Sequence, residues 1–191
     1  MKLNIVVAAL AVLGGAMPMP AIRAQETNPP PTILETFEAQ VGTVLIKGSG
    51  QIGSVSAQAG LVSVKCKESK DARTGRKESG IAVGLKAGDL PEDTTIIDYD
   101  ELDSFLYGID YISRVDYTVT PLPSFDAVYT TRGGLRIVAH SSNKRPGTIQ
   151  AALQSGHIPG ARVLLAPDQL AQFQALVQQA KAKLDSLRAN K

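Results

Sequence analysis

The sequence predicts an α+β protein made of two tandem β-β-β-β-α repeats, each with an antiparallel sheet and one helix, related by a pseudo-two-fold axis. The first observation is an internal repeat: residues 80–105 align without a gap on residues 148–173, and seven of the 26 pairs are identical. The second is that residues of strand character precede an apolar stripe with helical spacing in both copies. Because one copy alone would leave an apolar face uncovered, we expect the two copies to share one core.

The first repeat is expected over 34–117. Aliphatic and β-branched runs between turn residues predict strands over 43–49, 61–68, 76–85 and 94–98, with room for one more strand. A helix follows, because Asp98 can cap it and Glu101 can complete a capping box. Its apolar stripe consists of Leu102, Phe105, Leu106, Ile109, Ile112 and Val115.

The second repeat is expected over 121–191 and follows the same order. Strands are predicted over 124–131, 134–141 and 147–155, with a short aliphatic strand after them. Pro167 suits the first position of the closing helix. The apolar stripe of this helix consists of Leu170, Phe173, Leu176, Val177, Ala180, Leu184 and Leu187.

The first 24 residues read as a secretory signal. Lys2 precedes an apolar run over 5–16, and small residues lead to an expected cleavage after Ala24, with Ala21 as second candidate. A run of 12 residues is shorter than the roughly 20 that span a membrane. The prediction is therefore a secreted or periplasmic protein without a transmembrane segment after cleavage; the alternative is an N-terminal anchor that stays attached.

The mature chain is expected to form one domain. Residues 25–33 are polar and rich in proline, which predicts a flexible linker, and residues 34–191 suit a single globular domain. Cys66 is the only cysteine, so an internal disulfide is excluded. Its thiol is either redox-active or a small packed strand residue, and the sequence favours the second.

Charge is distributed unevenly along the chain. Residues 25–120 carry 9 Lys and Arg against 15 Asp and Glu, a net of −6, and residues 121–191 carry 9 against 3, a net of +6. Such asymmetry indicates either an anion-binding face or two halves that neutralise each other, within one molecule or between two.

Two basic groups are the candidate polyanion-binding residues. Alternate residues of a strand share one face, so a β-hairpin over 65–77 could align its cations as a ribbon. The alternative is a solvated hairpin whose lysines protect an exposed edge. The candidates are Lys65, Lys67, Arg73, Arg76 and Lys77 on the hairpin and Arg132, Arg136, Lys144 and Arg145 in the basic half.

Three further motifs are interpreted as structural. The segment GSGQIG at 48–53 matches a dinucleotide-binding pattern, but no helix can follow it, so a glycine-rich hairpin or bulge is expected and no cofactor. The acidic residues at 98–103 mark a helix start rather than a cation site. His140 beside Ser141 is a weak pointer to a hydrolase, since neighbours in sequence do not make a base and a nucleophile. No catalytic or metal-binding residue is therefore assigned.

Four tyrosines gather around the first predicted helix. They indicate either a face for a partner, including a second copy in a homodimer, or cover for the edge of the core. They are Tyr99, Tyr107, Tyr111 and Tyr117.

The order of elements, together with the segments 161–177 (ARVLLAPDQLAQFQALV) and 94–109 (TTIIDYDELDSFLYGI), resembles the PUR-alpha and whirly group of tandem β-β-β-β-α proteins. That resemblance implies curved sheets that bind single-stranded nucleic acid, and dimerisation. The chain departs from it in having only Phe37, Phe125 and Tyr129 as aromatic residues expected on strands, no tryptophan and a mature net charge of zero. The chain also resembles exported bacterial proteins.

These observations predict an exported, non-catalytic binding or structural module. Its expected ligand is a polyanion or a protein partner, bound through the sheet and the basic hairpin. The alternatives are a single-stranded nucleic-acid-binding protein of the PUR-alpha and whirly type and, less favoured, a hydrolase using His140 and Ser141.

Overall fold

The computed structural model describes residues 31–58, 60–141, 149–156 and 160–189, and the predicted signal lies outside them. The elements occur in the order α1 (Ile33–Glu38), β1 (Leu45–Ala57), β2 (Gly60–Asp71), β3 (Lys77–Ala87), β4 (Asp93–Asp98), a 3₁₀ turn η1 (Tyr99–Glu101), α2 (Leu102–Ser113), β5 (Asp126–Thr130), β6 (Arg136–Ser141), β7 (Ile149–Gln154), β8 (Arg162–Leu165) and α3 (Pro167–Ala189).

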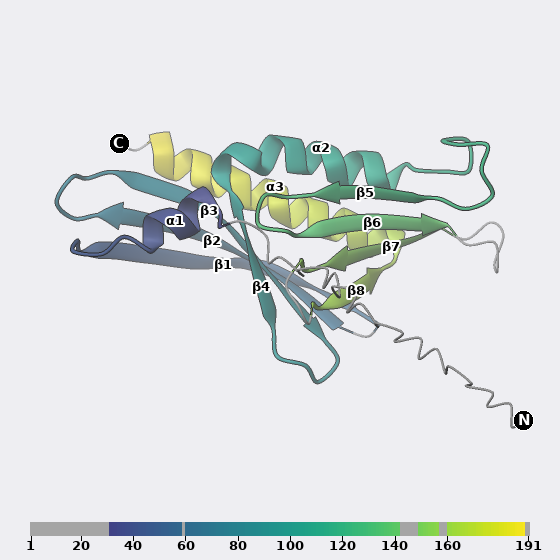
Figure 1. The fold of residues 1–191 in the computed structure, drawn as a ribbon, viewed down its shortest axis with the longest axis horizontal. Helices are drawn as coiled ribbons and strands as arrows, with labels where there is room; N and C mark the ends of the chain where they lie inside the picture. Colours follow the sequence, from purple (N-terminus) through teal and green to yellow (C-terminus); the bar gives the residue numbers. More distant parts are fainter. Residues whose placement is uncertain (1–30, 59, 142–148, 157–159, 190–191) are drawn as a thin grey trace, which may run out of the picture.

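The strands form two antiparallel four-stranded sheets. Sheet A has the order β1-β2-β3-β4 and sheet B the order β5-β6-β7-β8, so consecutive strands are neighbours throughout. Each sheet is followed in the chain by a helix (Figure 1). The predicted α+β class and the tandem β-β-β-β-α order are confirmed, and Pro167 opens α3 as expected.

The helices are exchanged between the repeats. Helix α2, which ends the first repeat, packs on β5 and β6 of sheet B, while α3, which ends the second repeat, packs on β1 and β2 of sheet A. The two helices also contact each other, and Figure 1 shows them along the same side of the molecule. Because each helix covers the other repeat's sheet, neither half could bury its apolar surface alone.

Repeat-equivalent aromatic residues meet at the centre of the core. Phe105 and Phe173, which lie 68 residues apart, are fully buried and pack edge to face with their ring centroids 6.1 Å apart. Such edge-to-face pairs stabilise a core by about 1 kcal/mol beyond the area they bury. Phe105 and Phe173 are the last aligned pair of residues 80–105 and 148–173. This pair of the sequence repeat is therefore in direct contact in the core.

At two contacts between a helix and a strand, a glycine allows the two elements to approach closely. A Cβ added to Gly108 of α2 would lie 2.5 Å from Tyr129 of β5, and one added to Gly53 of β1 would lie 2.6 Å from Leu176 of α3. Gly108 and Leu176 are again 68 residues apart. The helix supplies the small residue in one contact and the strand supplies it in the other, so the packing stays complementary while the residues differ.

The segment before β1 is a helix, which corrects two expectations. Helix α1 begins at Ile33 with a capping box between Thr32 and Glu35, so residues 32 and 33 are ordered structure rather than the end of a linker. Phe37, expected on a strand, is buried in this helix. Leu34 packs with Ala82 and Ile96 on the outer face of sheet A, the face turned away from α3.

Asp98 caps a different helix from the one predicted. Its carboxylate oxygens accept hydrogen bonds from the backbone N–H groups of Ile33 (2.8 Å) and Leu34 (2.9 Å) in α1, 64 and 65 residues away. It makes no capping bond to the turn that opens α2. The sequence identified Asp98 as a capping residue, but the helix that it caps is α1 and not the helix that follows it in the chain.

The glycine motif at 48–53 lies within strand β1. The pairing of β1 with β2 shifts register between Gln51 and Gly53, as a β-bulge does. The predicted glycine-rich hairpin strand with a bulge is confirmed. Within the described residues, no helix combines the length and apolar character that crossing a membrane requires.

Candidate functional site

The basic hairpin mainly supports helix α1. Lys67 and Lys47 lie 3.2 and 3.3 Å from the carboxylate of Glu38. Arg76 lies over the ring of Phe37 at 5.3 Å. Burial alone would raise the pKa of Glu38, but hydrogen bonds from Ser69 and Lys67 outweigh it and hold the pKa below its ordinary value. These cations therefore hold the N-terminal helix on sheet A.

The other hairpin candidates do not join them in one site. Lys77 lies on the opposite, core-side face of sheet A and pairs with Glu68 at 3.1 Å. Lys65 and Arg73 are exposed, and within the described part of the chain neither side chain has an ion pair. The cations of the hairpin therefore do not form a continuous ribbon; they lie on both faces of sheet A and on the turn after β2.

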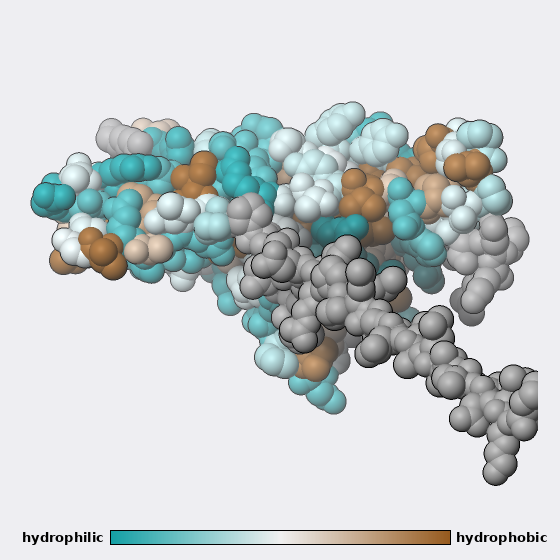
Figure 2. All heavy atoms as spheres, viewed as in Figure 1, coloured by the Kyte–Doolittle hydropathy of each residue, from teal (hydrophilic) through white to brown (hydrophobic). Residues whose placement is uncertain are grey.

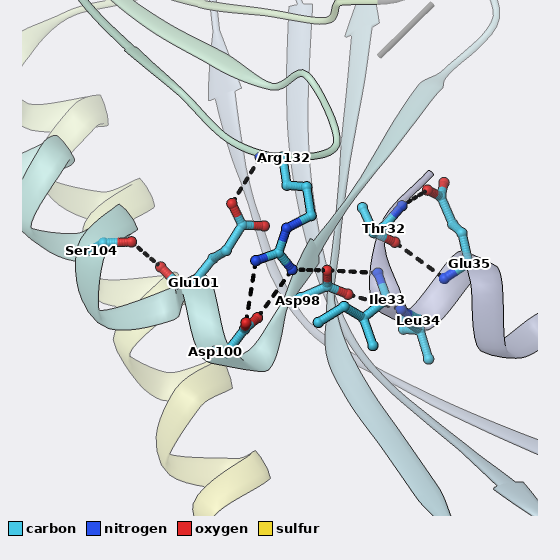
Figure 3. A network of polar contacts seen from close by, with 9 residues as sticks. All are labelled: Thr32, Ile33, Leu34, Glu35, Asp98, Asp100, Glu101, Ser104 and Arg132. Atoms are coloured by element: carbon cyan, nitrogen blue, oxygen red, sulfur yellow. Dashed lines mark hydrogen bonds and ion pairs between the residues drawn. The ribbon is translucent and has the colours of Figure 1, made fainter. Parts of the chain in front are cut away.

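Arg132 is the centre of a polar network (Figure 3). Its guanidinium lies 2.6 Å from Asp98 and 3.2 Å from Asp100, and its backbone N–H donates to Glu101 at 2.8 Å. The hydrogen bonds that Arg132 donates to Asp100 and Asp98 raise its pKa above its already high ordinary value. Because Asp98 also caps α1, this network joins α1, the start of α2 and the β5–β6 turn, and it uses Arg132 for structure.

The acidic residues at 98–103 are all engaged within the protein. Asp98, Asp100 and Glu101 bind Arg132, and Asp103 lies 3.5 Å from Lys181 of α3. Among the described residues, no group of three or more His, Cys, Asp or Glu side chains has an arrangement that could hold a metal ion.

His140 and Ser141 point to opposite faces of sheet B. The His140 Nδ1 contacts the Asp126 carboxylate on the exposed face. Ser141 is fully buried, accepts a hydrogen bond from the backbone N–H of Phe125 at 2.8 Å and donates to its carbonyl. A base–orienter pair is present, but the hydroxyl next to it in sequence is on the wrong side of the sheet to act as its nucleophile.

The outer face of sheet B, away from α2, carries cations without partners. Arg136, Gln154 and Arg162 are cross-strand neighbours on β6, β7 and β8. Neighbouring positions of this kind are about 5 Å apart, which places the two arginines about 10 Å from each other. Both are exposed, and neither has a hydrogen bond or ion pair within the described residues. The sheet thus presents two free guanidinium groups on either side of an amide.

The next row of this face is apolar. Val128, Val138, Ala152 and Leu164 are successive cross-strand neighbours; Val128 and Leu164 at the two ends are 42% and 47% exposed, and Val138 and Ala152 between them are buried. The same face contains a shallow hollow of about 340 Å³ bounded by Arg136, Arg162 and the His140–Asp126 pair. A partner would therefore meet two exposed aliphatic side chains with a cationic row beside them. We call these two rows the open face of sheet B.

The candidate residues divide as follows. Arg136 is on β6 of sheet B, whereas the hairpin group lies on or beside sheet A. Lys144 and Arg145 lie outside the described residues. Arg162 was missed by the sequence reasoning because it stands alone among apolar residues in ARVLL. Arg162 and the apolar Val163 are successive residues of a predicted strand and therefore face opposite sides of the sheet. This alternation could have placed the Arg162 side chain on the outer face.

The tyrosines separate into inward and outward groups. Tyr99 lies under the guanidinium of Arg188 at 4.1 Å and bonds Asp185 of α3. Tyr107 and Tyr111 are 67% and 51% exposed, with ring centroids 6.4 Å apart on α2. Figure 2 shows a mostly pale surface over α2, with brown, hydrophobic residues over the loop that follows it.

No protein-family model, curated protein or solved structure matches the chain. The likeness to the PUR-alpha and whirly group therefore rests on the order of elements and the short segments described above.

Proposed function

We propose that this chain is an exported, non-catalytic binding module whose partner is a protein segment with both acidic and apolar side chains. The open face of sheet B is its binding surface. The observation that carries this proposal is the row of Arg136 and Arg162, which have no partner among the described residues, directly beside the exposed Val128 and Leu164. Cations next to apolar surface suit a partner that brings carboxylates and aliphatic groups together.

The molecule itself contains a template for such a partner. On sheet A, α1 packs Leu34 on Ile96 and places Glu38 against two lysines. Ile96 and Leu164 are equivalent residues of the repeat, 68 positions apart. Ile96 is only 6% exposed because α1 covers it, whereas Leu164 is 47% exposed. A segment of the α1 type, acidic and apolar, is the chemistry that this kind of face accepts.

The open face is a poorer match to nucleic acid. Single-stranded bases need aromatic side chains on which to stack. The described residues on this face include no Phe, Tyr or Trp; Tyr129 of β5 faces the core and packs against Phe105 at 6.0 Å. The arginines alone would contact phosphates, but the apolar row would gain nothing from them.

The test is fluorescence anisotropy of the purified protein with a labelled peptide of residues 31–42, which carries the apolar and acidic groups of α1. We expect binding that weakens with salt. It should fall at least about tenfold in the double variant Arg136→Glu, Arg162→Glu, because each reversal places a like charge against the peptide. Leu164→Ser should weaken it as well.

The matched control is Arg73→Glu, an exposed arginine on the turn beside sheet A, which should bind the peptide as the wild type does. Single-stranded DNA and heparin are measured in parallel. Tighter binding of either, with a steep salt dependence and no response to Leu164→Ser, would replace the protein partner with a polyanion.

A further inference from the structure

Strand β1 has an unpaired edge. It is the outermost strand of sheet A, 13 residues long, and pairs only with β2 among the described strands (Figure 1). Exposed edges are usually protected by proline or by charges, because their free N–H and C=O groups attract other strands. β1 has no proline, and its single charged residue, Lys47, lies on the outer face, where Glu38 binds it. Among the described side chains, Gln51 and Gln169 donate to the β1 carbonyls of Gly53 and Ser56, so the edge over residues 45–50 is the part left open for pairing.

A groove runs beside this edge, between β1 and the last turns of α3. Gly48 and Gly50 face the helix, and a Cβ on Gly50 would meet nothing within 4 Å. The space, about 280 Å³, is lined by these glycines together with Ile52, Cys66, Leu184 and Leu187.

The groove has a closed end and an open end. At Gly53 the helix touches the strand, since a Cβ there would lie 2.6 Å from Leu176. About three turns further along α3, Leu187 is 38% exposed at the mouth. Because Gly48 and Gly50 have no side chains, there is room between strand and helix for a side chain of another molecule.

Charged residues also line the groove: Lys183, Lys67 and the carboxylate of Glu68, and of these Lys67 is paired with Glu38 and Glu68 with Lys77. Lys183 of α3 is exposed and has no ion pair within the described residues. Cys66 lies at the floor, 5% exposed, with its Sγ donating to the carbonyl of Ala180 at 3.4 Å. Burial raises the pKa of this thiol and Lys183 partly opposes the rise, so the lysine acts electrostatically on the groove interior.

We propose that β1 and this groove form a second binding site, which takes an extended peptide of a partner protein by strand addition. The peptide backbone pairs with the free edge of β1, and alternate side chains enter the groove. The groove accepts an apolar side chain against Leu184 and Cys66 and an acidic side chain at Lys183. This site is on sheet A and is independent of the open face of sheet B.

The test is selection of a random ten-residue peptide library, displayed on phage, against the wild-type protein. Selected peptides are then measured against Gly50→Leu, which fills the groove, and against Ser54→Leu, which places the same side chain on the other face of β1, outside the groove lining. We expect peptides with apolar residues at alternate positions and an acidic residue. Their affinity should fall at least about tenfold in Gly50→Leu, because a buried apolar side chain loses its site. It should be unchanged in Ser54→Leu.

Two further measurements separate strand addition from other binding. N-methylation of alternate backbone amides of a selected peptide should abolish binding for one parity only, because only those amides face β1. Bound peptide should also slow the reaction of Cys66 with a thiol reagent. The proposal is overturned if selected peptides bind Gly50→Leu as they bind the wild type, or if no peptide is enriched. A wild-type dimer that hides Cys66 would assign the edge to a second copy and also overturn it. A negative result in these experiments would not contradict the proposed binding by the open face of sheet B, because Arg136 and Arg162 are not part of the β1 site.

Discussion

The outer faces of the two sheets are equivalent by the repeat, but only one of them is covered. On sheet A, α1 buries Ile96 and its Glu38 binds the cations of β1 and β2. On sheet B, the equivalent Leu164 is 47% exposed and Arg162 beside it has no partner among the described residues. The difference teaches that the repeat created two similar faces and that the short helix before β1 closed one of them. Three sets of substitutions test this comparison.

The largest effect is expected from Asp98→Ala. This carboxylate is almost fully buried, caps α1 and holds Arg132, so its loss removes the cap and leaves a cation without its closest partner. We expect the free energy of unfolding to fall by about 3 to 4 kcal/mol, as measured by urea denaturation. Asp100→Ala, which removes the more exposed partner of the same arginine, should cost less than about 1 kcal/mol. Equal losses would show that Asp98 is not the residue that joins the two elements.

The second variant pair compares the repeat-equivalent residues directly. Ile96→Ser should lower the free energy of unfolding by about 3 kcal/mol, because it opens a cavity under α1 and buries a hydroxyl. Leu164→Ser should change it by less than about 0.5 kcal/mol, because the side chain is already half in solvent. Thermal or urea unfolding of both proteins is sufficient. A large loss in Leu164→Ser would mean that the face of sheet B is covered in solution.

The smallest effect is expected from Glu38→Gln, and it should depend on pH. The pKa of Glu38 is lowered in the folded state, so its charge contributes stability above the ordinary value of 4.5 and loses it as the pH falls through the lowered folded pKa. We expect a cost of about 1 kcal/mol at pH 7 that shrinks below about pH 4. The measurement is urea unfolding at pH 7 and pH 3.5. A cost independent of pH would assign the effect to packing alone.

The repeat made much of the fold predictable from the sequence. The alternation of Ile81, Val83 and Leu85 and the stripe that includes Leu102 and Phe105 are local patterns, and they gave the correct strands and helix. Leu187 was expected on the buried stripe of α3 but lies partly exposed at the groove. The groove lies beside the glycines of strand β1, and the apolar pattern of helix α3 contains no information about another element.

The candidate site was less predictable because ion pairing is a long-range property. Lys67 and Arg136 look alike in sequence, yet one is bound by a carboxylate from α1 and the other faces solvent. Asp98 shows the same limit: its capping chemistry was anticipated, but its partners, Ile33 and Leu34, come from a segment expected to contain linker.

The sequence by itself determined the periodic features: two copies of four strands and a helix, the bulge-forming glycines of β1, and a single cysteine that excludes an internal disulfide. These depend on neighbours in the chain, which local sterics and hydrophobic period govern. Only the tertiary structure decided that each helix covers the other repeat's sheet, that α1 takes up the cations of sheet A, and that Arg136 and Arg162 remain free. The physical reason is that burial and charge pairing are settled between residues brought together by folding, often more than 60 positions apart in the chain.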